Sequence, residues 1–243
     1  MTMVPDLVRE RFRLKQTIVT ITAQEEGHLE AAKEEIAVQR ALLEDFIRDD
    51  PFFMLTLEPY DRAIEKAPPI IKEMVRAGSA VGIGPMSAVA GTIARFALEA
   101  MIRTGATHAI VDNGGDVALV TDRKVLMGIY AGSSPLKNLA FEISPRARLF
   151  GICTSSGTVG PSISFGSADA AIVVSEDVSL ADAAATALGN AVGEGSSLAD
   201  SFNVVDKPGI GGALVIRGEE MALWGDLPPL KRANLRPDLI TRA

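Results

Sequence analysis

Apolar residues recur with helical spacing in four stretches of the chain. In the longest stretch, Leu29, Ile36 and Leu43 fall on one side of a helix and charged residues fall on the other. Pro51 ends this stretch, whereas Pro69 opens the next helix, at a position where its missing N–H does no harm. The pattern predicts helices over residues 25–49, 68–77, 85–104 and 179–190, and a short apolar linker at 52–57.

Strands are predicted where apolar residues alternate with polar ones, or run together between Gly, Asn, Asp and Ser. Asn113-Gly114 lies between two such runs and is a typical hairpin turn. Gly218-Glu219 joins a second predicted hairpin. The predicted strands cover residues 11–22, 107–111, 117–120, 125–131, 139–143, 150–153, 170–175, 213–216 and 221–224.

The order of these elements predicts the fold class. No linker composition and no internal repeat divides the chain, so we expect residues 1–243 to form a single domain. Its class is α+β, with mostly antiparallel sheets and packed helices. Residues 228–243 are polar, contain three prolines and are expected to form an extended C-terminal tail.

The composition indicates a core built from small side chains. Hydrophobic residues make up 47% of the chain but aromatic residues only 5%, and there are 22 glycines. Cores of this kind let backbones approach one another, or a ligand, closely. The apolar middle of the chain also favours self-association into a homo-oligomer.

Charge and cysteine content exclude several classes of partner. The net charge is −7, with no compensating basic cluster, which argues against nucleic-acid binding. No run approaches the ~18 apolar residues needed to cross a bilayer, and the first residues do not resemble a signal peptide. The single cysteine, Cys153, excludes a disulfide framework. We therefore expect a cytoplasmic protein with no membrane partner.

The helix over residues 179–190 carries the first candidate for chemistry. Asp182 and Thr186 are four residues apart and share one face of a helix that otherwise consists largely of alanine. Their oxygens are the only side-chain groups there that could reach a hard cation. Two structural alternatives stand beside this metal site: Ser179 and Asp182 match a capping box, and the Thr186 hydroxyl could bond the Asp182 carbonyl.

Three loops could hold a ligand, and each also has a structural explanation. The segment from Gly82 through Gly84, Pro85 and Met86 resembles a dinucleotide fingerprint, but a predicted helix precedes it and Ser87 replaces the third glycine. A loop that packs, or that presents free N–H groups to a ligand, is the alternative.

The second loop is the turn of Asn113, Gly114, Gly115 and Asp116. Its two glycines could let a ligand touch the main chain, with Asp116 accepting a hydrogen bond, or could simply make a hairpin. The third loop offers hydroxyls on Thr154, Ser155, Ser156 and Thr158, together with Gly157. Such loops suit phosphate oxygens, and are also typical of polar surface turns.

Catalytic bases are scarce. The chain has only two histidines, His28 and His108, and neither is assigned to catalysis. Cys153 is interpreted as a small buried apolar residue, because no base that would activate it can be identified.

Taken in order, these motifs resemble the ApbE superfamily, whose best-known members are FAD:protein FMN transferases. The closer resemblance is to a small ApbE-like family. The matching motifs span roughly residues 81–192, and the similarity is weaker on both sides. They are residues 84–91, which include Gly91, the Asn113–Asp116 turn, residues 151–157, and the Ala-Asp-Ala-Ala-Ala-Thr-Ala run at 181–187.

The resemblance implies a T-fold-like α+β domain with a cleft for a flavin nucleotide, FAD or FMN. It also implies that Asp182 and Thr186 bind magnesium. Magnesium takes six oxygens, and readily accepts phosphates and water among them. A carbonyl near residues 88–90 and a diphosphate would complete the set.

Two departures from the transferases bear on the reaction. They carry a histidine in a His-Ile-x-Asp-Pro segment after the Ser-Gly loop, where this chain reads Pro161-Ser-Ile-Ser-Phe-Gly166. They also carry a lysine in the glycine-rich helix start, where this chain has apolar residues. FMN transfer requires deprotonation of the acceptor hydroxyl, and no group is identified for that step.

Two functional hypotheses follow. The first is a magnesium-dependent site for a phosphorylated, flavin-type ligand, at which FMN or phosphoryl transfer, or hydrolysis, takes place. The second is a non-catalytic module that binds a flavin or pterin nucleotide. A third reading is an assembly whose apolar helices form an oligomer interface.

Overall fold

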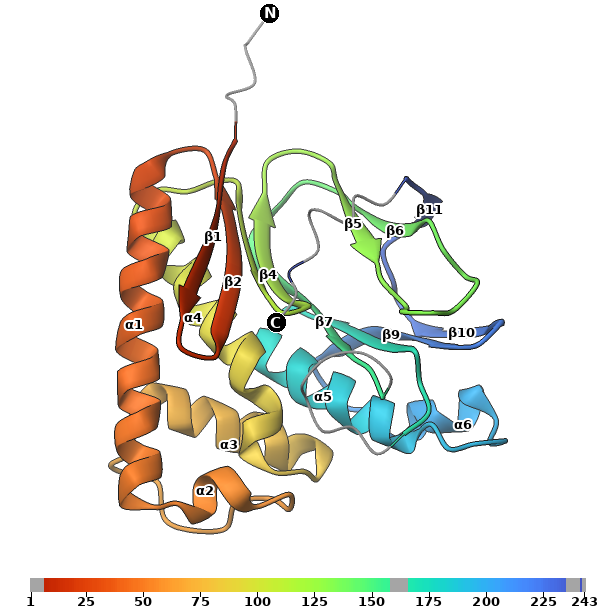
Figure 1. The fold of residues 1–243 in the computed structure, drawn as a ribbon, viewed down its shortest axis with the longest axis horizontal. Helices are drawn as coiled ribbons and strands as arrows, with labels where there is room; N and C mark the ends of the chain where they lie inside the picture. The colour runs from red at the N-terminus through yellow and green to blue at the C-terminus, as the bar shows by residue number, and fades with distance from the viewer. Residues whose placement is uncertain (1–6, 158–165, 235–240, 242–243) are drawn as a thin grey trace, which may run out of the picture.

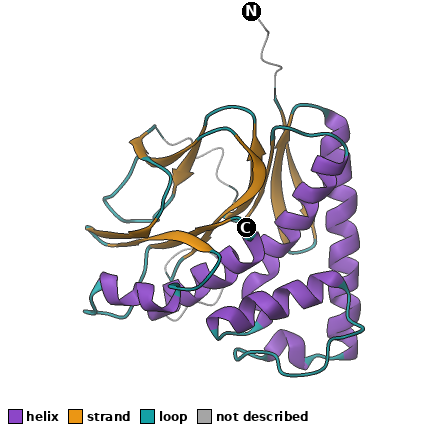
Figure 2. Cartoon of the chain, turned by 180° about the vertical axis from the view of Figure 1, so that it is seen from behind, coloured by secondary structure: helices purple, strands orange, loops and turns teal. Residues whose placement is uncertain are grey.

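The computed structural model describes residues 7–157, 166–234 and 241. Its framework is an eight-stranded antiparallel sheet with the strand order β1-β2-β3-β4-β7-β8-β9-β10. Helices cover one face of this sheet and a small three-stranded sheet lies against the other (Figures 1 and 2). The strands of the large sheet are β1 (Val8–Leu14), β2 (Thr17–Ala23), β3 (Ala109–Asn113), β4 (Asp116–Thr121), β7 (Arg146–Ser155), β8 (Ala170–Ser175), β9 (Ile210–Arg217) and β10 (Glu220–Gly225).

The helical layer packs on the face that Val111, Cys153 and Val173 present, all three fully buried. It contains α4 and α5, which contact each other and the central strands. α1 packs against α4 and also contacts β1 and β2, and α3 packs against α5. Shorter helical segments connect these elements. The helices are α1 (Glu26–Asp49), α2 (Phe52–Leu55), α3 (Pro69–Val81), α4 (Val89–Arg103), α5 (Val178–Ala191) and α6 (Leu198–Ser201), and the 3₁₀ turns are η1 (Pro85–Ala88) and η2 (Phe202–Val204).

The small sheet has the order β11-β6-β5, formed by β5 (Val125–Ile129), β6 (Leu139–Ile143) and β11 (Leu230–Arg232). A second core fills the space between the sheets. Leu119 of β4 and Phe141 of β6 are fully buried there. The large sheet is therefore covered on both faces, which explains why two of its strands, β4 and β8, are buried along their whole length.

The α+β class with antiparallel sheets is confirmed, while several element boundaries differ from the prediction. Residues 11–22 are not one strand, because Lys15 adopts a left-handed conformation (φ 55°) and turns the chain back between β1 and β2. No Gly, Asn or Asp marks this turn, so the apolar pattern runs through it. The helix expected over 85–104 begins as the 3₁₀ turn η1.

The other differences are smaller. α3 continues one turn beyond the predicted end and stops at Gly82, whose φ of 76° is typical of a helix C-terminus. The linker at 52–57 contains α2. β7 is longer than predicted, since its first half carries arginines in place of apolar residues. Part of the expected C-terminal tail, β11, pairs with β6.

No single helix among the described residues is long and apolar enough to span a membrane. One pair, α3 with the η1–α4 segment, is long and apolar enough when taken together, but it is bent by 107°.

Thr241 lies back on the large sheet, where its hydroxyl bonds Thr20 Oγ1 (2.7 Å) and Asp112 Oδ2 (2.6 Å).

Candidate functional site

Asp116 and Asp182 come together between the sheet and the helical layer. Asp116 is the first residue of β4, and Asp182 lies on the second turn of α5. Their carboxyl groups share a hydrogen bond, and the side chains are only 9% and 6% exposed. Two carboxylates at such a site cannot both keep a full negative charge without a proton or a cation between them.

The first turn of α4 holds the Asp182 carboxylate. The backbone N–H of Gly91 donates to Asp182 Oδ2 at 2.7 Å, and the N–H of Ala90 also stabilises the charged form. These N–H groups belong to the start of a helix, where they have no intrahelical partner and where the helix dipole favours an anion. Asp182 therefore fixes α5 against α4.

Gly91 makes this contact sterically feasible. A Cβ at Gly91 would lie 2.7 Å from the Asp182 Cβ and 2.9 Å from the Val178 carbonyl oxygen. The two helices can approach this closely only because position 91 has no side chain. The small residues in the sequence motif thus serve helix packing first, and through it they position the carboxylate.

Only one oxygen of the Asp116 carboxyl has hydrogen-bond partners among the described residues. The Thr154 backbone N–H and the Cys153 thiol bond it, in addition to Asp182. Its Oδ1 atom is buried and has no hydrogen-bond partner among the described residues. Burial raises the pKa of Asp116 to about 7, and raises the pKa of Asp182 well above its ordinary value. The negative charge of Asp116 further raises the pKa of Asp182, and the charge of Asp112 further raises the pKa of Asp116.

Cys153 is a neutral neighbour of this pair. Its side chain is fully buried, its Sγ lies 3.7 Å from the Val178 carbonyl oxygen, and burial together with the two carboxylates raises the pKa of the thiol well above its usual range. A thiol that stays protonated is a hydrogen-bond donor and a poor nucleophile. The interpretation of Cys153 as a non-nucleophilic buried residue agrees with this environment.

The turn that precedes Asp116 is a hairpin. Gly114 and Gly115 both have positive φ (71° and 107°), as a two-residue turn of this hand requires, and Asn113 pairs with Asp116 across it. The Asn113 amide donates to the Ala90 carbonyl at 3.0 Å. The turn thus ties the end of β3 to the start of α4.

Among the described residues, the structure contains neither of the two structural alternatives, the capping box of Ser179 and Asp182 and the hydrogen bond from Thr186 to the Asp182 carbonyl. Asp177, and not Ser179, caps α5, since its side chain accepts from the Leu180 N–H. No hydrogen bond joins the Thr186 hydroxyl to the Asp182 carbonyl in the part of the chain that the structure describes. Thr186 is half-buried, one turn beyond Asp182 on the same face of α5.

The hydroxyl loop lies at the end of β7, beside the carboxyl pair. Thr154 is close to Gly115, with its Cβ 3.8 Å from the Cβ position of that glycine. Ser155 and Ser156 are buried, and the Gly157 N–H donates to the Ala168 carbonyl. Thr158 and the following residues through 165, where the transferase histidine would be expected, lie outside the described residues.

The segment at Gly84, Pro85 and Met86 is a packing turn. The Gly84 N–H donates to the Leu57 carbonyl at 2.7 Å, and a Cβ there would lie 2.1 Å from the Thr56 carbonyl oxygen. The turn follows helix α3 and not a strand, so the dinucleotide fingerprint is excluded. η1, which contains Pro85 and Met86, nevertheless packs against α5 and so lies in the same region as Asp182.

Both histidines are engaged elsewhere. His28 Nδ1 lies 2.8 Å from Thr104 Oγ1, and His108 Nδ1 lies 3.0 Å from Thr121 Oγ1. Both side chains are buried, and burial lowers the pKa of His108. Neither is placed to act as a base at the carboxyl pair.

The described residues contain no group of three or more His, Cys, Asp and Glu side chains that could hold a metal. The pair Asp116–Asp182 would therefore need further oxygens from hydroxyl, ligand or water. The orphaned Asp116 Oδ1 fits a cation, since a buried acceptor without a donor is satisfied by a positive ion. The carbonyls of Ala88 and Ala90 already accept bonds from Thr92 and Asn113.

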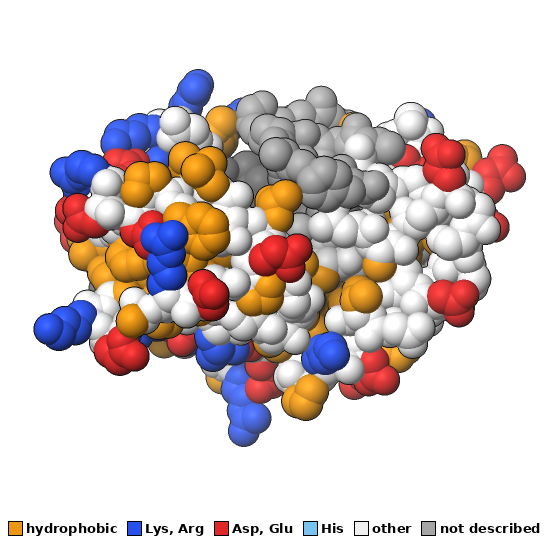
Figure 3. Space-filling view, turned by 90° about the horizontal axis from the view of Figure 1, so that it is seen from below, with side chains coloured by type: hydrophobic (Ala, Val, Ile, Leu, Met, Phe, Trp, Pro, Cys, Tyr) orange, Lys and Arg blue, Asp and Glu red, His pale blue; other side chains and the backbone are white. Residues whose placement is uncertain are grey.

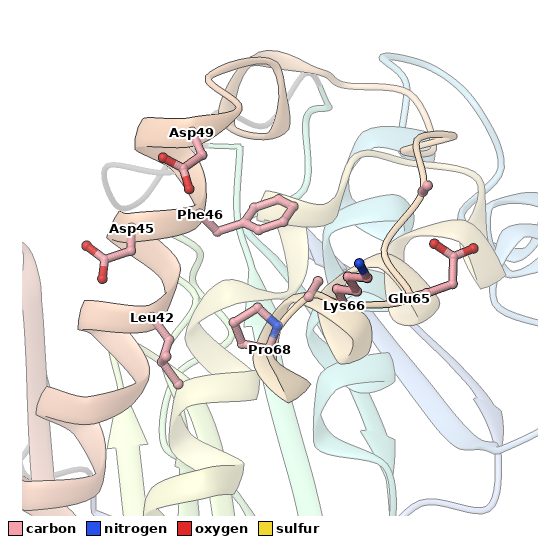
Figure 4. A pocket seen from close by; sticks show the side chains of 9 residues that line it. Leu42, Asp45, Phe46, Asp49, Glu65, Lys66 and Pro68 are labelled. Atoms are coloured by element: carbon pink, nitrogen blue, oxygen red, sulfur yellow. The ribbon is translucent and has the colours of Figure 1, made fainter.

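A surface hollow of about 490 Å³ lies away from this pair, between the end of α1 and the loop before α3. Its lining includes Leu42, Phe46 and Pro68 (Figure 4). Next to it, α2 lies at the lower end of the molecule. Seen from that side, hydrophobic side chains gather among charged ones (Figure 3). The exposed apolar residues of this segment are Phe52, Met54, Leu55 and Leu57.

Comparisons with known proteins agree with this architecture. A family model described as "AbpE bacteria" matches residues 2–206. A UPF0280 protein of Methanothrix thermoacetophila is 57% identical over 236 residues, which are 97% of this chain and 100% of that protein. The chain belongs to the UPF0280 family. A UPF0280 protein of Methanosarcina acetivorans is 58% identical and covers 97% of this chain and 94% of its own.

Solved structures extend the comparison to the fold. The flavinyl transferase ApbE of Pseudomonas stutzeri, in its apo form, superposes with a TM-score of 0.58 at 11% identity, covering 94% of this chain and 96% of that one. The ApbE protein of Thermotoga maritima gives 0.55 at 14% identity, over 98% and 100% of the two chains. At these identities the similarity shows that this UPF0280 protein has an ApbE-like fold.

Sequence reasoning did not find every residue of the site. It missed the contact between Asp116 and Asp182, because the two lie 66 positions apart and no local pattern links them. It also missed Asp177 as the cap of α5. The signal was available in that case, since Asp is a preferred N-cap residue and stands directly before the apolar run.

Proposed function

We propose that this UPF0280 protein binds a phosphorylated, flavin-type ligand through a magnesium ion held by Asp182, Asp116 and Thr186. The observation that carries the proposal is the buried carboxyl pair with its unpartnered Asp116 Oδ1. A divalent cation would neutralise both carboxylates and remove the unfavourable free energy of burying them together. The Thr186 hydroxyl would add a third oxygen.

We infer the nature of the ligand from the magnesium ligands that the side chains of this site do not supply. Magnesium binds six oxygens, and three from side chains leave positions for phosphate and water. The hydroxyls of Thr154 and Ser155, beside Asp116, suit the remaining phosphate oxygens. The ApbE-like fold, shared with proteins described as flavin transferases, supports a flavin nucleotide such as FAD or FMN.

The environment of the site favours binding over transfer. Transfer of FMN to a hydroxyl needs a base, and in the described residues both histidines are engaged elsewhere while the Cys153 thiol is held protonated. When bound, magnesium would supply charge neutralisation on a diphosphate. The residues of this chain would hold and orient the phosphates.

Thermal unfolding with FAD, FMN and ADP, each with magnesium or with EDTA, tests the proposal. Ligand at ~100 times its dissociation constant stabilises the folded state by ~2.7 kcal/mol. For a chain of this length that raises Tm by roughly 5–10 °C. We expect the increase with a flavin nucleotide plus magnesium, and its loss in Asp182→Asn, which keeps an acceptor for the Gly91 N–H. Exposed Asp206→Asn is the matched control.

Mass spectrometry of the same mixtures separates binding from chemistry. A Tm increase without FMN release or a protein adduct supports the binding module. Release of FMN from FAD would assign a reaction to the site. If no nucleotide shifts Tm, or if Asp182→Asn shifts like wild type, the magnesium-dependent site is wrong.

A further inference from the structure

A second hollow, of about 590 Å³, lies at the edge between the two sheets. Its volume is within the range typical of small-molecule sites. It is lined by the start of β7, the end of β8 and the segments that lead into β9 and β11. In β7, Arg146 of this hollow is seven residues from Cys153, which is roughly 23 Å along an extended strand. The hollow is therefore separate from the carboxyl pair.

Arg146 is the only basic residue among the described residues that line this hollow. Its guanidinium lies over the Phe150 ring, 3.7 Å from the ring centroid, which fixes the orientation of the side chain. Its Nε is buried and has no hydrogen-bond partner among the described residues. Burial lowers the pKa of Arg146, and the negative charge of Glu176 offsets this effect only in part.

The carboxylate nearest to Arg146 is held loosely. Glu176 Oε1 lies 3.5 Å from Arg146 Nη2, and Glu176 Oε2 lies 3.9 Å from Arg148 Nη1. Guanidinium–carboxylate hydrogen bonds are usually about 2.7–2.9 Å long. The Glu176 side chain is 57% exposed, so it can leave Arg146 at little cost.

Other charges at the hollow do not compete for Arg146. Glu142 faces the Lys124 ammonium at 3.3 Å, and Asp226 is exposed. The other lining residues combine apolar side chains, among them Pro145, Leu227 and Pro229, with the hydroxyls of Ser144 and Ser175. The hollow thus offers one oriented cation, loosely paired with Glu176, beside apolar side chains such as Leu227 and Pro229. Such a surface complements a ligand in which an anionic group is attached to an apolar part.

We propose that this hollow binds a small carboxylate with an apolar body, its carboxylate pairing with Arg146 in place of Glu176. A carboxylate matches the planar fork of the guanidinium, whose one face is covered by Phe150. The inference does not depend on magnesium or on Asp182.

Benzoate serves as the probe, and benzyl alcohol as its uncharged counterpart. Binding is followed by ¹H–¹⁵N NMR, including the arginine Nε–Hε resonances. We expect benzoate to shift the Arg146 Nε–Hε signal and the amides of Phe150 and Val174, and benzyl alcohol to leave the Arg146 signal unchanged. Arg146→Gln should weaken benzoate binding about tenfold or more, as expected for loss of a charge-assisted hydrogen bond.

Two further variants sharpen the test. Glu176→Gln removes the internal competitor and should tighten benzoate binding several-fold, with Arg146 intact and without touching the core. Arg48→Gln, on the exposed end of α1, removes the same charge elsewhere and should have no effect. The proposal is overturned if benzoate leaves the Arg146 signal unshifted in both wild type and Glu176→Gln. It is also overturned if inorganic phosphate binds at Arg146 and benzoate does not.

Discussion

Burial of the Asp116 carboxyl is the residue-level feature with the widest consequences. An isolated carboxylate at this position would be strongly destabilising, and the structure offsets the cost with the Thr154 N–H, the Cys153 thiol and a hydrogen bond shared with Asp182. These groups satisfy only part of its capacity. A proton can meet the rest, as the raised pKa of Asp116 indicates, and the proposed cation would compete with that proton.

The first prediction concerns pH in the absence of metal. The pKa of Asp116 rises from 3.8 to about 7 on folding. Between about pH 4 and pH 7 the folded state therefore holds a proton that the unfolded state has released. The free energy of unfolding should decrease as pH rises through this window, by a few kcal/mol, and Asp182, whose pKa is also raised, acts in the same direction.

Urea unfolding in EDTA, at pH values from 4 to 8, measures this dependence. Asp116→Asn removes the raised carboxyl, so its curve should decline less steeply than that of wild type. Carboxylates with lowered pKa, such as Glu44, act in the opposite direction but are common to both proteins and cancel in the difference. Parallel curves for the two proteins would contradict the assignment.

Among the elements, the contact between α4 and α5 determines the site. α5 brings Asp182 to the N–H groups at the start of α4, and Gly91 gives the helices the space to meet. Asn113 ties the β3–β4 hairpin to the same turn of α4 through the Ala90 carbonyl. A change in the packing of either helix should therefore reach the carboxyl pair.

The second prediction tests the helix contact through Gly91→Ala. Alanine normally stabilises a helix by up to about 1 kcal/mol over glycine. Here the new Cβ would overlap Asp182 and Val178, so we expect a loss of about 1–3 kcal/mol. Gly27→Ala in α1 is the matched control, because its Cβ meets no atom within 4 Å, and it should stabilise slightly. Chemical unfolding gives both values; equal effects would refute the packing argument.

The third prediction concerns the start of α5. Asp177 accepts from the Leu180 N–H and forms an ion pair with Arg76 at 2.6 Å. Asp177→Ala should cost about 1 kcal/mol, mostly from the lost cap. Asp177→Asn keeps the cap and should cost less, because partly exposed ion pairs contribute little. If the two variants lose equal stability in urea unfolding, the ion pair and not the cap is decisive.

At the scale of the whole molecule, one sheet serves two cores. Its helical face positions the carboxyl pair, and its other face packs against the small sheet, around Phe141 and Leu119. The hollow at Arg146 lies at the border of the second core. The molecule thus separates its two candidate ligand sites on opposite ends of β7.

The fourth prediction follows from the size of the small sheet. With three strands and two edges it should open more readily than the central strands, so amides of β5 and β6 should exchange with solvent before those of β4 and β8. Hydrogen exchange by mass spectrometry checks the order of exchange, and uniform exchange across both sheets would contradict it.

The core between the sheets is sensitive to the loss of a large side chain. Phe141→Ala should destabilise the protein by about 3–5 kcal/mol.

Much of the fold was predictable from the sequence, because local patterns encode it directly. The helices α1, α3 and α5 follow from apolar spacing, with prolines marking the end of α1 and the start of α3, and the Gly114-Gly115 hairpin follows from its turn residues. The β1–β2 hairpin was not predictable, since Lys15 turns the chain without a typical turn residue. Candidate residues such as Asp182 were found by type and spacing alone.

What the sequence by itself determined is the kind of oxygen donor on α5 and the small side chains around it. Only the tertiary structure decided that Asp182 meets Asp116, that Gly91 is where two helices touch, and that Arg146 lies over Phe150 beside a hollow. The physical reason is that burial, charge compensation and pKa depend on neighbours from distant parts of the chain. Local patterns fix secondary structure, and long-range packing fixes the chemistry.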